Sequence, residues 1–177
     1  MSTKKATILA GGFLLLAVGL LVWQLTGGSA ADSPDDPLSG LTYEKAAPKA
    51  DREAATVAIS RKSRAVAVPE LRRIAREDPD PTVRAVAIAG LGEHRDYKSM
   101  DLILDGLESG SHAERVRATA AAGRMLGPRR VDPQTDSKEQ RQRIIAEAYR
   151  RMWQSLKGSP RLDEFQKKID RTYGELP

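Results

Sequence analysis

Hydrophobic residues are arranged in two different ways along this chain. Residues 6–25 read ATILAGGFLLLAVGLLVWQL, a run of twenty residues without a charged side chain. As an α-helix this run would be about 30 Å long, which matches the hydrocarbon core of a bilayer. From residue 49 onward, apolar side chains recur at helical spacing between charged ones. This second pattern predicts amphipathic helices that pack on one another.

The flanks of the apolar run predict a membrane anchor and its orientation. Two lysines precede the run and three aspartates follow it: Lys4, Lys5, Asp32, Asp35 and Asp36. Because positive charge stays on the cytoplasmic side, we expect residues 1–5 in the cytoplasm and the remainder outside it. The chain would then be a single-pass membrane protein with an extracytoplasmic domain.

A cleaved signal peptide is the alternative interpretation of the same run. Ser29-Ala30-Ala31 supplies the small residues of a cleavage site, and a basic start followed by an apolar run is common to both kinds of segment. A retained anchor is favoured because the apolar region of a signal peptide is usually only about 7–15 residues long. If the segment is cleaved, the domain is periplasmic or secreted. Both interpretations predict that the domain lies outside the cytoplasm.

Residues 26–48 are dense in Gly, Ser, Pro and Asp and lack apolar periodicity. Such a composition is typical of a flexible or partly extended linker. Leu41 and Tyr43 are the linker residues that we expect to pack on the start of the following domain.

A repeat of about 32 residues begins after the linker. Three similar segments carry Arg52, Arg84 and Arg117, whose spacings are 32 and 33 residues. A second helical segment follows each of them, at residues 68–75, 100–107 and 144–152. Two helices per unit at a fixed period of this size predict an α-solenoid. We assign it to residues 49–157, with a C-terminal capping helix in residues 158–177.

The predicted helix boundaries agree with capping chemistry. Asp80 precedes a proline at the first helical position, and Ser111 with Glu114 and Ser137 with Gln140 fit the capping box. Ser159-Pro160 begins a last helix with an apolar stripe at Leu162, Phe165, Ile169 and Tyr173. That helix is suited to covering the open end of the stack.

The central first helix is apolar on two faces, so we expect it to be covered on both sides. One stripe holds Val83, Val86, Ala87 and Leu91, and the other holds Ala85, Ile88 and Ala89. Ile88 should therefore be buried. Tyr149 and Trp153 lie on or beside an apolar stripe of their own helix, so we expect them in the core as well.

The turn Asp78-Pro79-Asp80-Pro81-Thr82-Val83-Arg84 and the alanine-rich helix after it resemble HEAT repeats, in particular the short phycobilisome-lyase type. Val116-Arg117-Ala118 repeats part of the pattern. The resemblance extends from Asp51 to Leu126 and fades beyond Gly127. It implies an all-α fold, but such arrays serve as scaffolds, adaptors and a few enzymes, so the fold leaves the function open.

Composition narrows the possible chemistry. The 177 residues have room for one domain with accessory segments. The chain has no cysteine, which excludes disulfides, thiolate metal sites and a cysteine nucleophile. No phosphate-binding loop, nucleophile elbow or zinc-protease motif occurs. We therefore expect no enzymatic activity and no metal or other cofactor.

Two further groups could carry chemistry, and both have simpler interpretations. Arg84 and Arg117 could bind anions, but in the family the equivalent arginine braces a repeat turn through acidic residues, and Asp80 and Glu114 are available for this. Glu93-His94 is similar to the His-Glu pairs of HEAT-fold deoxyhypusine hydroxylases. Its order is reversed and it occurs once, whereas a metal site needs several converging ligands.

In HEAT arrays the second helices line the concave face, so their outward residues define a candidate partner surface. We select Arg72, Arg73, Arg76, Asp101, Asp105 and Arg150. Acidic residues between two basic groups suit a phosphate backbone poorly, and the net charge of +5 is modest. We therefore expect a protein partner and no nucleic acid, with the arginines serving binding more than stability. The alternative is a lyase-like or chaperone-like protein that acts on a substrate chain, which a deep pocket would favour.

Overall fold

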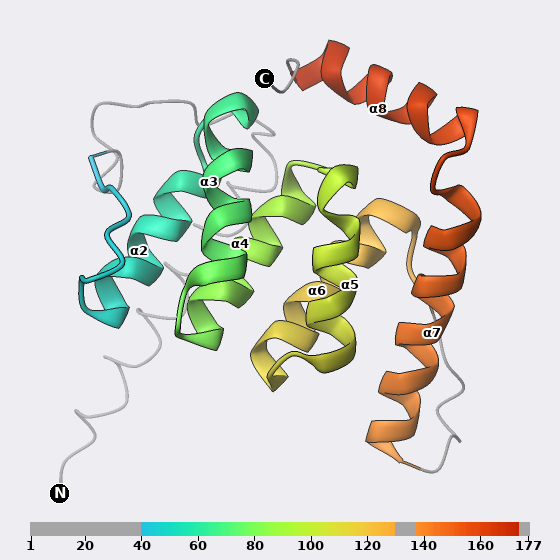
Figure 1. Ribbon diagram of the computed structural model, residues 1–177, viewed down its shortest axis with the longest axis horizontal. Coiled ribbons are helices and arrows are strands. Elements are labelled where there is room, and N and C mark those ends of the chain that lie inside the picture. The colour runs from blue at the N-terminus through green and yellow to red at the C-terminus, as the bar shows by residue number, and fades with distance from the viewer. Residues whose placement is uncertain (1–39, 130–136, 174–177) are drawn as a thin grey trace, which may run out of the picture. The chain divides into compact units, whose positions relative to one another are not determined.

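The computed structural model describes residues 40–129 and 137–173. This part of the chain is helical throughout and contains no strand. The helices are α2 (Lys49–Ser60), α3 (Arg64–Glu77), α4 (Pro81–Glu93), α5 (Met100–Ser109), α6 (His112–Leu126), α7 (Lys138–Leu156) and α8 (Pro160–Tyr173), with a short 3-10 helix, η1 (Tyr97–Ser99), before α5 (Figure 1). The all-α prediction is confirmed for these residues.

The predicted anchor, residues 6–25, lies outside the described residues, as do most of the linker and residues 130–136. Within residues 40–129 and 137–173, no helix combines the length and the hydropathy that crossing a bilayer requires.

Helices α2 to α7 form three successive pairs, as the period predicts. Each pair has a first helix (α2, α4 or α6) and a second helix (α3, α5 or α7). Neighbouring first helices pack side by side, α2 on α4 and α4 on α6, and the second helices α3 and α5 pack against α4 and α6 respectively (Figure 1). The core lies between these layers.

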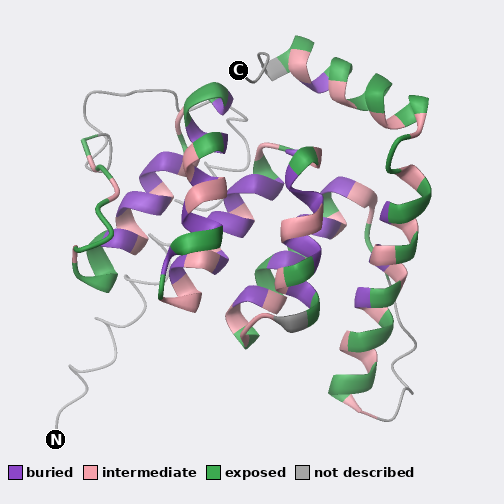
Figure 2. Ribbon diagram, viewed as in Figure 1, coloured by how far each residue is buried: buried purple, intermediate pink, exposed green. Residues whose placement is uncertain are grey.

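Helix α4 is covered on both sides, which confirms the prediction from its two apolar stripes. Val83, Ala87 and Leu91 are fully buried, and Ile88 is only 1% exposed. Burial in Figure 2 is concentrated in α4 and in the inward faces of its neighbours. Tyr149 and Trp153 of α7 are also buried, so their predicted place in the core is confirmed.

The N-terminal capping residues expected from the sequence lie at the starts of α4, α6 and α7. The Asp80 carboxylate accepts hydrogen bonds from the backbone N–H groups of Thr82 and Val83 at the start of α4. Ser111 and Glu114 form a reciprocal capping box on α6. At the start of α7, the Ser137 hydroxyl accepts from the N–H of Gln140. These bonds satisfy helix donors that have no partner within the helix.

Small residues let α4 and α6 approach closely. A Cβ atom on Gly92 would lie 2.5 Å from Cβ and 2.7 Å from Cα of Ala121. Non-bonded carbon atoms essentially never approach so closely, so only glycine fits at this crossing without a shift of the helices. The alanine-rich sequence of both helices is what makes the close approach possible.

Helix α8 is joined to the first repeat as well as to the third. Leu162 packs against the core and Ile169 is buried, whereas Phe165 remains 43% exposed. The Asp170 carboxylate lies 2.6 Å from Nη1 of Arg64 at the start of α3. The apolar stripe of α8 is therefore only partly covered.

Candidate functional site

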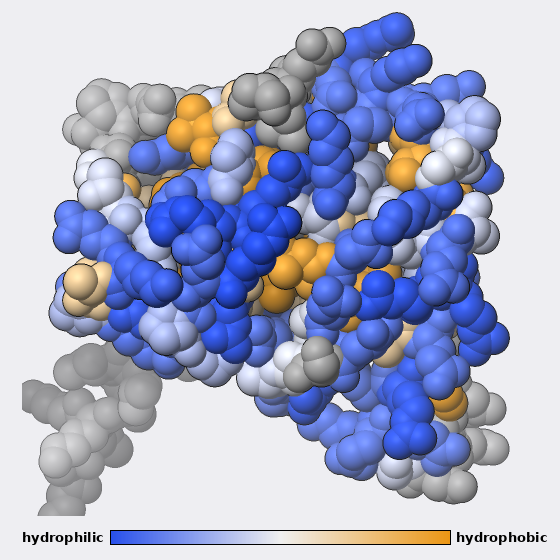
Figure 3. Space-filling model, in the orientation of Figure 1, coloured by the Kyte–Doolittle hydropathy of each residue, from blue (hydrophilic) through white to orange (hydrophobic). Residues whose placement is uncertain are grey.

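An open groove of about 540 Å³ runs between the second helices α3 and α5. Apolar and small residues from three helices form its floor: Ala75, Ile88, Leu102, Gly106 and Gly110. Arg76 of α3 and Asp105 of α5 stand on its two banks. Figure 3 shows hydrophobic surface near the centre of this face, surrounded by hydrophilic side chains.

The two banks carry opposite charges that solvent reaches. Arg76 is exposed at the last turn of α3, and the side chain of Asp105 is 66% exposed. Gly106 keeps the groove open on the α5 side, since a Cβ there would meet Cδ1 of Ile88 at 2.9 Å. An apolar floor between a cation and a carboxylate can bind the side chain of a protein partner and also fix its orientation.

Arg72, a second predicted surface residue, is engaged inside the fold. Its Nη2 lies 2.6 Å from Oδ1 of Asp96, and its Nε donates to Oδ2 of Asp96 and to the Ser99 hydroxyl. The Asp96 side chain is completely buried. Removing the Arg72 guanidinium would leave this carboxylate with less compensation, so we omit Arg72 from the candidate surface.

Arg73 also has partners within its own repeat. Its guanidinium pairs with Glu70 one turn earlier and lies 4.0 Å from Glu77. It also stands 5.0 Å from the centre of the Tyr43 ring. The hydrogen bond to Glu70 raises the pKa of Arg73. Arg73 is thus a partly exposed member of a local cluster at the edge of α3.

Asp101, Asp105 and Arg150 are brought together, although 45 residues separate Asp105 from Arg150. Arg150 donates to Glu108 at 2.7 Å and to Asp105 at 2.8 Å, and its Nη1 lies 3.6 Å from Asp101. The hydrogen bond to Glu108 contributes most to the raised pKa of Arg150. The acidic helix α5 is therefore partly neutralised by the basic helix α7.

Asp101 has further partners on α7. Lys157 donates to it at 2.7 Å and the Trp153 indole N–H at 2.9 Å. The bond from Lys157 is the main reason that the pKa of Asp101 is lowered. Asp101 therefore helps to position α7, while Asp105 faces the groove.

Two of the three repeat arginines, Arg52 and Arg84, hold successive units together. Arg84 Nε lies 2.7 Å from Glu114, and its Nη1 donates to the backbone carbonyls of Asp78 and Pro79. The expected bracing by Glu114 is confirmed. Asp80, the other expected acid, instead caps α4 and lies 3.2 Å from Lys49. Arg117 is exposed on α6.

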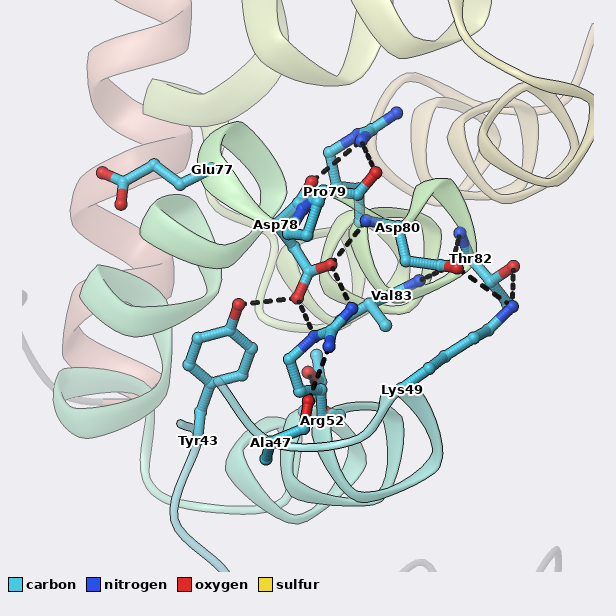
Figure 4. Close-up of polar contacts among 12 residues, drawn as sticks. Tyr43, Ala47, Lys49, Arg52, Glu77, Asp78, Pro79, Asp80, Thr82 and Val83 are labelled. Carbon is cyan, nitrogen blue, oxygen red and sulfur yellow. Dashed lines mark hydrogen bonds and ion pairs between the residues drawn. The ribbon is translucent and has the colours of Figure 1, made fainter. Parts of the chain in front are cut away.

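Asp78 is the bracing acid that the sequence did not reveal (Figure 4). Its buried carboxylate accepts from Arg52 Nε at 2.9 Å and from the Tyr43 hydroxyl at 2.6 Å. Burial alone would raise the pKa of Asp78, but these hydrogen bonds outweigh it and lower the pKa. Burial and the bond to Asp78 raise the pKa of Tyr43 to about 12. Tyr43 thus anchors the end of the linker on the first repeat.

The histidine beside Glu93 has a structural contact. His94 is the C-cap of α4, and its Nε2 lies 3.0 Å from the Ser60 carbonyl oxygen. Burial is the main cause of its lowered pKa. Within the described ranges, no three His, Cys, Asp or Glu side chains are grouped as metal ligands would be. Glu93 points to Arg124, 4.0 Å away.

Comparison with known proteins gives one match. The family model described as HEAT repeats matches residues 40–133, which is more than half of the chain. No curated protein and no solved structure matches.

Proposed function

Because the chain belongs to the HEAT-repeat family, we propose that it is a non-enzymatic interaction module that binds another protein in the groove between α3 and α5. HEAT repeats are generally scaffolds for protein–protein interaction. The observation that carries the proposal is the open apolar floor between the cationic bank at Arg76 and the anionic bank at Asp105. Interfaces of this kind combine an apolar centre with a polar rim.

The proposed module is held at a membrane by residues 6–25 and faces away from the cytoplasm. The length of the uncharged run and the lysines before it support this part of the proposal. For a partner held at the same membrane, the tether raises the effective concentration, so a groove with modest intrinsic affinity would be sufficient.

A lyase-like or chaperone-like activity is the less favoured alternative. Such an activity needs a site that encloses part of its substrate, and the α3–α5 groove is open along its length. Arg84, Glu114 and Ser111 also line the groove, but Arg84 and Glu114 pair with each other and Ser111 caps α6. The guanidinium of Arg76 and the carboxylate of Asp105 stand on opposite banks, which suits recognition better than acid–base chemistry at one atom.

A photo-crosslinking amino acid at position 102, in the groove floor, tests the groove in native membranes and leaves Arg76 and Asp105 in place. We expect a discrete protein adduct from position 102 and none from position 117, an exposed position on α6. Asp105→Asn in the same chain should reduce the adduct severalfold, while Arg150 keeps its bond to Glu108. The proposal would be contradicted by equal adduct yields from both positions. It would also be contradicted by an adduct yield that Asp105→Asn leaves unchanged.

A further inference from the structure

A second groove, of about 680 Å³, lies between α8 and the C-terminal ends of α6 and α7. Its apolar lining includes two methionines, three aliphatic side chains and one phenylalanine: Met125, Met152, Leu126, Leu156, Leu162 and Phe165. The groove is separate from the α3–α5 groove and shares no lining residue with it.

The described charges that line this second groove all have one sign. Arg95, Arg161 and Lys168 reach it, and no carboxylate of residues 40–129 or 137–173 does. Among the described residues, none of the three cations forms an ion pair, whereas Arg72, Arg84 and Arg150 all do. Unpaired cations beside apolar surface attract a ligand that carries negative charge and apolar groups together.

Arg95 has an unusual backbone conformation at the end of α4. Arg95 has φ 49°, and it is the only residue other than glycine with positive φ in the described part of the chain. It follows α4 in a Schellman ending, where the N–H of Arg95 bonds to the Gly92 carbonyl and the N–H of Asp96 to the Leu91 carbonyl. Glycine usually takes this position because a side chain is strained there. This turn therefore carries a long cationic side chain at a position where glycine would be less strained.

Apolar surface remains open on the α8 wall of the groove. Phe165 is 43% exposed, and the Arg161 guanidinium lies 5.6 Å from the centre of its ring. Ile169 is buried and Asp170 is bonded to Arg64, so both fix α8 in place. The wall is therefore held at one end and offers an aromatic side chain and a cation to a ligand.

We propose that this groove binds an acidic amphipathic segment of a partner protein, with apolar side chains on one face and carboxylates on the other. Amphipathic helices bind in this way, by placing anchors at helical spacing into an apolar groove between helices. Methionine side chains suit such a surface because they adapt to anchors of different shape. The three cations would pair with the carboxylates of the bound segment and set its direction.

The inference rests on the proposed function only in that the domain binds protein chains. The two grooves use different residues, so each proposal fails on its own variants. Changes at Arg76 and Asp105 test the first groove, and changes at Arg161 and Lys168 test the second.

The test uses the full chain in phosphatidylcholine nanodiscs and a fluorescent peptide of about 18 residues, roughly five helical turns. The peptide carries Leu and Phe at positions i, i+3, i+4 and i+7 and Glu elsewhere. Two control peptides replace every Glu by Lys or scramble the apolar positions. Fluorescence anisotropy should show saturable binding of the acidic peptide, weakened by salt, and at least about tenfold weaker binding of both controls.

Paired charge reversals locate the binding. Arg161→Glu with Lys168→Glu should weaken the acidic peptide at least about tenfold, the size expected when like charges are brought together at an interface. Lys167→Glu with Arg171→Glu makes the same change in net charge on α8, at exposed residues outside the groove, and should leave affinity within about twofold. The melting curve of each variant should match the wild type; if the double reversal melts early, Lys168→Glu alone replaces it.

Three outcomes would overturn the proposal. The first is that the acidic peptide does not bind. The second is that both pairs of charge reversals weaken peptide binding equally. The third is binding of phosphatidylglycerol vesicles that depends on Arg161 and Lys168 while the peptide does not compete, which would assign the groove to an anionic lipid surface. Absence of the adduct at position 102, with intact peptide binding, would contradict only the α3–α5 groove.

Discussion

Arg72 and Asp96 form a two-point ion pair, with Nη2 to Oδ1 at 2.6 Å and Nε to Oδ2 at 2.8 Å. The pair joins the middle of α3 to the turn before α5, so it connects the second helices of adjacent repeats. Arg52 and Asp78 make the equivalent connection from α2 to the turn before α4. Adjacent repeats are thus held by buried carboxylates as well as by apolar packing.

Arg72→Ala should lower the free energy of unfolding by roughly 3–5 kcal/mol, because it leaves the buried Asp96 without its cation. Arg76→Ala, four residues later on the same helix, should change it by less than about 0.5 kcal/mol. Urea denaturation followed by circular dichroism measures both. Equal stability of the two variants would show that the pair contributes little to folding.

Gly92→Ala should destabilise the domain by roughly 1–3 kcal/mol, because the added Cβ forces α4 and α6 apart. In an uncrowded helix the same change gains about 1 kcal/mol, so the sign of the effect is informative. Gly106→Ala is the matched control, since its Cβ would meet two side-chain atoms, Cδ1 of Ile88 at 2.9 Å and Cβ of Ala118 at 3.8 Å, and no backbone atom. If thermal melting shows Gly92→Ala to be as stable as the wild type, the α4–α6 crossing is described incorrectly.

His94 should make stability depend on pH just below neutrality. Its folded-state pKa is lowered from the ordinary value of 6.5, mainly by burial. Above pH 6.5 the ring is neutral in both states and contributes no pH dependence. As the pH falls below that value, the unfolded state binds the proton more readily, so stability decreases until the pH reaches the folded-state pKa.

His94→Gln should remove this part of the pH dependence. The free energy of unfolding, measured between about pH 8 and pH 5, should fall more steeply for wild type than for the variant. Asp78, Asp80 and Glu114 have lowered pKa values, so their contribution is lost at more acidic pH. Parallel curves for the two proteins would exclude a titrating His94.

The proposed topology is tested independently of the grooves. Reporter domains fused after Leu41 should be active only in an extracytoplasmic assay, because the lysines precede the apolar run. Carbonate washing should leave the full chain in the membrane pellet. Release of a soluble form whose N-terminus lies near Asp32 would establish the cleaved signal peptide instead.

Local pattern was sufficient to predict the helices and much of the core. The repeated arginines set the register, the two stripes of α4 placed Ile88 inside, and Ser111 with Glu114 marked the start of α6. The stripes and the capping box depend on residues within one or two turns of each other, where spacing determines geometry. The arginine register depends instead on the regular repeat period.

Polar contacts between repeats could not be predicted from local spacing. Arg72 looked like an outward residue because helical spacing says nothing about a carboxylate 24 residues later in a turn. Asp105 and Arg150 appeared as separate bands of charge, although the packing of α7 on α5 joins them. The floor of the α3–α5 groove depends on side chains from three helices, so no single segment indicates it.

The Arg64–Asp170 pair has a consequence for the order in which the chain folds. It spans 106 residues, the longest separation among the side-chain hydrogen bonds described, while the helix pairs form between close neighbours in sequence. Neighbour contacts close short loops and form early, whereas the closure of a long loop must wait until the intervening chain is compact. We therefore expect the bond between α8 and α3 to form late in refolding, after the helix pairs have assembled.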